Sequence, residues 1–86
     1  MDTVFKALAD DNRRKILELL RKKDMSVTEL LTNFKITQAS LSHHLDILKR
    51  AKLVIAERRG QYIYYSLNMS VTEELLEWLM KRFGKG

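Results

Sequence analysis

The side chains in this sequence that are best suited to chemistry are hydrogen-bonding groups on one side of a predicted helix. Gln38, Ser42 and His43 lie opposite a stripe of leucines when residues 37–51 are placed on a helix of 3.6 residues per turn. A glutamine amide pairs with adenine through two hydrogen bonds, and serine or neutral histidine can donate or accept at a base edge. The pattern predicts that these three side chains contact DNA bases; the alternative is an ordinary solvated helix surface.

A second group of polar and basic residues is predicted to contact the DNA backbone. Thr37 and Ser40 belong to the first turn of the same helix, and Arg50 lies near its end. Arg58 and Arg59 stand next to a glycine, where a guanidinium can bind phosphates or enter a narrow minor groove. The alternative for these two arginines is that they only keep a turn soluble.

The segment 26–51 carries the signals of two helices joined by a tight turn. Ser26 and Glu29 match a capping box, in which each residue satisfies a free N–H group of the helix start. Thr37 can cap the next helix, which is predicted to end near Ala51. This arrangement predicts a helix-turn-helix, the motif that sets one helix into the major groove of DNA.

Two further helices are predicted before this motif, and a hairpin and a helix after it. The first helix covers residues 2–9, and Asp10 or Asp11 can cap the second. The last helix covers residues 70–83 and is predicted to open with a capping box of Ser70 and Glu73.

The hairpin is predicted over residues 53–67, with strands at 53–58 and 61–67. Gly60 can take the positive φ that a tight hairpin needs. On the second strand the side chains alternate, which predicts Ile63, Tyr65 and Leu67 inward and Tyr62 and Tyr64 outward. The sequence thus predicts one domain over residues 1–86, mainly α with a small β-hairpin, in the order α-α-α-α-β-β-α. This is a winged helix-turn-helix, and residues 53–67 are its wing.

Composition limits the other classes of function. The formal net charge is +5, which is consistent with a polyanionic partner, and there is no cysteine for disulfides or thiolate metal sites. No run approaches the length of a membrane span, and the first residues do not resemble a signal peptide. We find no glycine-rich phosphate loop and no nucleophile paired with a base, because Ser42 and His43 diverge as helix neighbours. An enzyme and a catalytic site are therefore not expected.

Three separated motifs resemble those of ArsR-type winged-helix repressors. They are the segments Phe5–Leu17, Ser40–Leu48 and Gly60–Leu67, and the likeness covers nearly the whole chain. Members of that family are cytoplasmic homodimers that bind palindromic operators and usually repress. The resemblance implies a dimer interface formed by the first and last helices, with these residues partly between subunits: Val4, Leu8, Leu75, Trp78, Leu79 and Phe83.

The metal sites of the family's sensors are not matched in this sequence. Ser26 and Thr28 stand in the region where arsenic and lead sensors carry cysteines, and hydroxyls are poor ligands for soft metals. The last helix has no histidine, and the adjacent His43 and His44 diverge by about 100°. We therefore expect no metal and no cofactor. The chain looks more like the short SdpR-like autorepressors that lack a metal site.

The resulting hypothesis is a homodimeric repressor, cytoplasmic and associated with the nucleoid, that binds an inverted repeat in double-stranded DNA. A sequestering protein partner could control it. Two alternatives remain open: a protein-interaction module that uses the winged helix and the last helix with Trp78, and a nonspecific DNA binder of the chromatin type.

Overall fold

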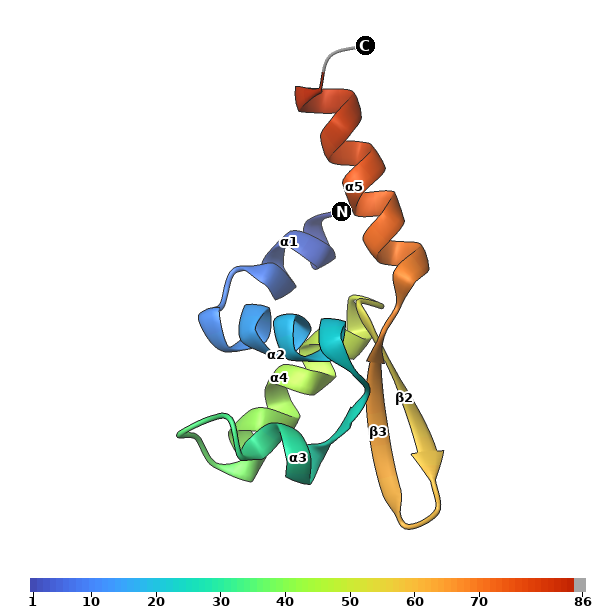
Figure 1. Ribbon diagram of the computed structural model, residues 1–86. Helices are drawn as coiled ribbons and strands as arrows, with labels where there is room; N and C mark the ends of the chain where they lie inside the picture. The colour runs from blue at the N-terminus through green and yellow to red at the C-terminus, as the bar shows by residue number, and fades with distance from the viewer. Residues whose placement is uncertain (85–86) are drawn as a thin grey trace.

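The computed structural model describes residues 1–84 as a helical body with a protruding hairpin and a long terminal helix (Figure 1). The elements follow in the order α1 (Asp2–Leu8), α2 (Asp11–Lys22), β1 (Met25–Ser26), α3 (Val27–Leu31), α4 (Gln38–Arg50), β2 (Val54–Arg59), β3 (Tyr62–Leu67) and α5 (Met69–Phe83). The predicted winged helix-turn-helix is confirmed, with one short strand added before α3.

Side-chain caps set the starts of three helices as the sequence predicts. Asp10 caps α2 by accepting hydrogen bonds from the backbone N–H groups of Asn12 at 2.8 Å and Arg13 at 3.2 Å. Ser26 and Glu29 form the capping box of α3. The N–H of Ser26 donates to the Glu29 carboxylate, and this hydrogen bond is the main reason that the pKa of Glu29 is lowered. The choice between the two aspartates is thereby settled in favour of Asp10.

The start of α5 differs from the prediction. Asn68 is the cap, its side chain accepting from the N–H of Ser70 at 3.2 Å, and the helix begins at Met69. The capping box expected from Ser70 and Glu73 is therefore wrong. Asn68 also donates its own N–H to the carbonyl of Leu53 at 2.9 Å, so the end of the hairpin places the cap.

The hairpin belongs to a three-stranded antiparallel sheet with the order β1-β3-β2, although the sequence predicted two strands only. Strand β1 pairs Met25 with Tyr65, a contact too distant in sequence to leave a local signal. Gly60 has φ +64°, while Gln61, the other residue of the hairpin loop, does not have a positive φ; this corresponds to a type II′ turn with glycine first.

The pairing of β2 and β3 shows which side chains share a face of the sheet. Ala56 lies opposite Tyr65 and Arg58 opposite Ile63, so all four share the face that packs on the body. Tyr65 packs against the core as predicted. Ile63 shares that face but is 41% exposed, because it lies at the tip of the wing beyond the body. The expected burial of Ile63 is therefore wrong.

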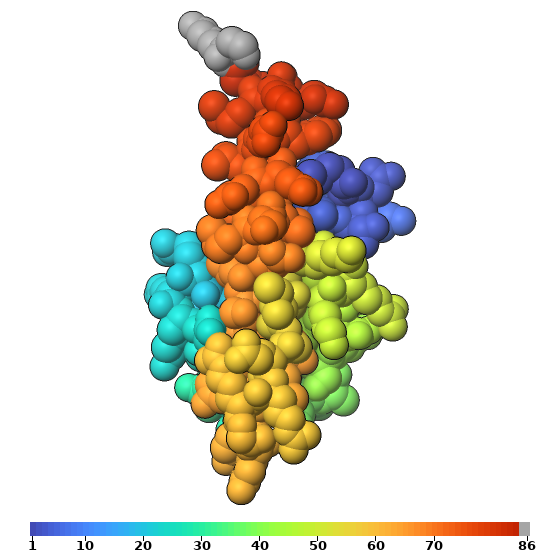
Figure 2. Space-filling view, turned by 90° about the vertical axis from the view of Figure 1, so that its right-hand side faces the viewer, coloured from blue at the N-terminus to red at the C-terminus, as the bar shows by residue number. Residues whose placement is uncertain are grey.

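The core lies where α2, α3 and α4 meet the base of the sheet. Its largest fully buried side chains are Ile16, Leu30, Leu41, Leu45 and Leu48. The three leucines of α4 are the predicted stripe, so burial of that stripe fixes which side of α4 remains outside. In contrast, α5 has no buried residue, and its C-terminal turns project beyond the rest of the molecule in both views (Figures 1 and 2).

Candidate nucleic-acid interface

The exposed side of α4 carries the three residues predicted to contact bases. Gln38 occupies the first helical position, and Ser42 and His43 follow on the surface; all three are exposed. Leu41 and Leu45 are fully buried on the opposite side, so the helix cannot rotate without opening the core. The structure therefore brings the predicted set together on one rigid, solvent-facing surface.

The N-terminal end of α4 is free of negative charge and well ordered by its cap. The Thr37 hydroxyl accepts from the N–H of Ser40 at 3.1 Å, while its own proton remains available to a phosphate oxygen. No acidic residue stands in the first turn, and the positive end of the helix dipole favours an anion there. Lys35 is exposed just before the cap. Lys35 was not among the residues predicted to contact DNA, although a positive charge in the turn before the helix could have pointed to it.

The C-terminal end of α4 is basic. Arg50 is exposed but pairs with Asp46 one turn earlier, at 2.9 Å, so part of its charge is compensated. Lys49 and Lys52 are exposed as well. Lys52 has φ +60°, the left-handed conformation that closes the helix end. The sequence indicated the charge of Lys52 near the end of the helix, but its backbone conformation depends on where α4 ends, at Arg50 with Ala51 as the C-cap.

His44 has a structural role at the edge of the core. Its Nδ1 lies 3.2 Å from Nη1 of Arg13 and 3.9 Å from a carboxylate oxygen of Asp10. Because a guanidinium only donates, Nδ1 accepts and the imidazole proton is assigned to Nε2. Arg13 also donates to the carbonyls of Lys6 and Ala7, so this cluster joins the end of α1 to α4.

Arg58 and Arg59, both predicted to contact the DNA backbone, have different partners in the wing. Arg59 donates to Asp24 at 2.7 Å and to Glu57 at 3.2 Å, and its guanidinium lies 5.0 Å from the centre of the Tyr64 ring. Arg58 donates to the carbonyl of Gly60 at 3.2 Å, and among residues 1–84 it forms no ion pair. Only Arg58 keeps an uncompensated charge at the wing tip.

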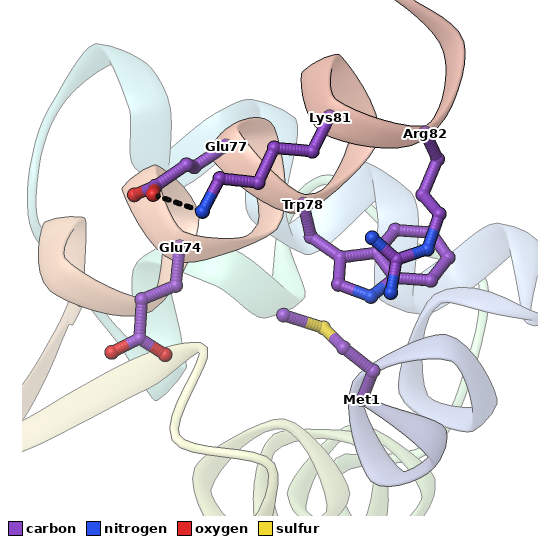
Figure 3. Close-up of a pocket in the computed structure, with 6 residues that line it drawn as sticks. All are labelled: Met1, Glu74, Glu77, Trp78, Lys81 and Arg82. Atoms are coloured by element: carbon purple, nitrogen blue, oxygen red, sulfur yellow. Dashed lines mark ion pairs between the residues drawn. The ribbon is translucent and has the colours of Figure 1, made fainter.

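The terminal helices α1 and α5 meet through aromatic side chains. Phe5 and Trp78 pack edge to face with ring centres 5.4 Å apart, and Arg82 lies over the indole at 4.7 Å. Trp78 and Arg82 line a hollow of about 350 Å³. The side chain of Met1 extends into it from the start of α1 (Figure 3).

The residues expected at a dimer interface differ in their exposure. Val4 is 8% exposed and belongs to the core of its own chain, while Phe83 is 79% exposed. Four others are half-buried: Leu8, Leu75, Trp78 and Leu79. The expected set lacked Leu76 and Met80, which are 60% and 58% exposed; both are apolar, which was a usable signal.

Within residues 1–84 no three histidine, cysteine or acidic side chains gather closely enough to hold a metal ion. None of the described helices combines the length and apolarity needed to cross a membrane.

Comparison with known proteins identifies the family. Residues 10–56, which contain α2 to α4, match the family model described as "Bacterial regulatory protein, arsR family". The transcriptional repressor SdpR of Bacillus subtilis is 45% identical over 86 residues, covering 100% of this chain and 96% of that protein. This chain belongs to the ArsR family. It is accordingly a DNA-binding transcriptional regulator and not an enzyme.

A further relative and two solved structures are also similar to this chain. The arsenical resistance operon repressor of Bacillus subtilis is 42% identical over 73 residues, covering 84% of this chain and 70% of that protein. The solved structure of HlyU from Vibrio cholerae superposes with a TM-score of 0.77 and 30% identity, covering 96% of this chain and 90% of that one. An ArsR-like regulator from Rhodococcus sp. RHA1 gives a TM-score of 0.86 at 28% identity, with coverages of 93% and 73%.

Proposed function

We propose that this ArsR-family regulator is a homodimeric repressor that binds an inverted repeat in double-stranded DNA. The observation that carries the proposal is the surface of α4. Its apolar stripe is buried, its first turn has no acidic residue, and its exposed side presents Gln38, Ser42 and His43. Such a helix enters the major groove with its N-terminal residues at the base edges.

Each predicted contact residue has a distinct role in this proposal. Gln38 pairs with an adenine, while Ser42 and His43 donate or accept at neighbouring bases. The hydroxyls of Thr37 and Ser40 bind phosphate at the N-terminal end of α4. Arg50 and Arg58 of the wing act on the DNA backbone, where contacts fix register rather than sequence.

Dimerisation through α5 is supported by the exposed apolar side of that helix. Leu76, Met80 and Phe83 are spaced four and three residues apart, so they form one stripe along the projecting part of α5. A monomer would leave this stripe in water, whereas a second copy related by a two-fold axis would cover it. Trp78 points to the opposite side of α5, toward Phe5 of α1, so the stripe by itself carries the proposed contact between two copies.

The cellular setting proposed for the chain is the cytoplasm, with the protein on the nucleoid. Repression of its own or a neighbouring operon fits the repressor SdpR, which matches the chain along its whole length. The exposed side of α5 also gives a sequestering protein a surface to compete for, since binding there would oppose dimerisation.

The test is selection of bound duplexes from a random DNA pool at physiological salt. An enriched inverted repeat with half-sites about 34 Å apart supports the proposal, because a dimer places its two recognition helices one helical turn apart. Binding without enrichment would indicate a nonspecific backbone binder. No retained DNA would favour a protein-interaction module that uses α5, and would contradict the proposed operator.

A further inference from the structure

The two wing arginines, adjacent in sequence, lie on opposite faces of the sheet. Arg58 shares its face with Ala56 and Tyr65, which pack toward the body. Tyr65 packs against the core to which α4 contributes its buried leucines, so this face of the sheet lies toward α4. Arg59 therefore points to the other face, away from α4.

Arg59 crosses the whole width of the sheet on that outer face. It starts from β2, passes over Tyr64 of the central strand at 5.0 Å, and reaches Asp24 just before β1 at 2.7 Å. The same guanidinium also pairs with Glu57, with its Nε 3.2 Å from the Glu57 Oε1. Two carboxylates thus surround one cation, which leaves the cluster with no positive charge to offer a phosphate.

We propose that Arg59 is a positioning residue that, through Asp24, straps the wing to the body, and that Arg58 is the wing's phosphate-binding arginine. This inference rests on the proposed contact between wing and DNA. A two-stranded ribbon is marginally stable by itself, so its direction depends on ties to its surroundings. The strap supplies such a tie near the tip, where no core residue lies.

Binding of a duplex carrying the selected operator, measured by fluorescence anisotropy across a salt series, separates the two roles. We expect Arg58→Ala to lower the slope of log affinity against log salt by about one, because one phosphate contact is lost. Arg59→Ala and Asp24→Ala should each weaken binding about two- to fivefold without changing the slope, as expected for loss of one exposed ion pair. The variant that carries both Arg59→Ala and Asp24→Ala should bind the duplex no more weakly than Arg59→Ala alone, because both changes remove the same ion pair.

Matched controls come from a second exposed ion pair, Arg21 and Glu18, at 2.9 Å on α2. Arg21→Ala and Glu18→Ala make the same charge changes away from the wing and should leave affinity and slope unchanged. Asp24→Glu keeps a carboxylate and should retain most of the affinity. Thermal melting of every variant confirms that it is folded, and Asp24→Asn replaces Arg59→Ala if that variant melts early.

Three outcomes would overturn the inference. If Arg59→Ala lowers the slope by about one while Asp24→Ala tightens binding, Arg59 is itself a phosphate ligand that Asp24 restrains. If neither substitution changes affinity, the strap does not position the wing. If the two losses add in the double variant, the residues act independently. Failure of the unaltered protein to bind any duplex at low salt would instead refute the proposed function.

Discussion

Replacement of Lys52 by glycine should stabilise this domain, although it removes a charged side chain. Lys52 follows α4 with φ +60°, the conformation in which Cβ crowds the next carbonyl oxygen. Hydrogen bonds that close the end of the helix offset this strain. The N–H of Lys52 donates to the carbonyl of Lys49, and the N–H of Leu53 donates to the carbonyl of Leu48, both at 3.0 Å. Leu48 and Leu53 are also buried, so the core holds the turn in place.

The size of the gain follows from two opposing terms. Relief of the left-handed conformation is worth about 1–2 kcal/mol. Glycine has more conformational freedom in the unfolded chain, which lowers the free energy of unfolding by about 0.5–1 kcal/mol. The net gain lies between about 0 and 1.5 kcal/mol, and its midpoint of about 0.75 kcal/mol corresponds to a rise in Tm of about 3–6 °C for a domain of this size.

The assay is thermal and urea unfolding followed by circular dichroism at one fixed protein concentration, since dimerisation makes stability depend on concentration. Lys52→Ala is the matched control, because it removes the same charge but keeps Cβ and therefore the strain. It should stay within about 0.5 kcal/mol of the unaltered protein. If Lys52→Gly is no more stable than Lys52→Ala, the conformational argument is refuted.

Three further predictions concern the recognition helix, a helix cap and the last helix. Gln38→Ala should cost about 1–3 kcal/mol of binding on the selected operator and almost nothing on an operator changed at the paired base, measured by anisotropy; an equal loss on both would exclude base contact. Asp10→Ala should lower the free energy of unfolding by about 0.5–2 kcal/mol near neutral pH. Burial raises the pKa of Asp10, but the hydrogen bonds from Arg13 and Asn12 and the nearby positive charges outweigh it, so the folded-state pKa is lowered. The cap's contribution is therefore present above pH about 4 and fades as the pH falls through that lowered pKa, and a difference that stays constant in urea titrations down to pH 2 would contradict this. Leu76→Glu should shift the protein to a monomer in analytical ultracentrifugation while leaving its far-ultraviolet circular dichroism unchanged, and an unaltered dimer would place the interface elsewhere.

Local signals in the sequence were enough to predict the order of the elements other than β1, and the exposed side of α4. Caps act over three residues, and a 3.6-residue period is visible within one helix, so Ser26 and Thr37 could be assigned from the chain alone, while the cap of α2 was narrowed to Asp10 or Asp11. The same period separated Gln38 from the buried leucines. Gly60 marked the hairpin turn because a positive φ favours glycine.

Contacts between distant segments could be known only from the tertiary structure. Strand β1 exists because Met25 meets Tyr65, and Arg59 is compensated because Asp24 lies across the sheet from it. Ile63 has the alternation of a buried residue, yet the wing carries it beyond the core. A pattern along the chain states which side chains share a face, but the position of the other segments decides what that face meets. For this protein the sequence determined the surface that α4 presents, and the packing of the wing decided which arginine stays free beside it.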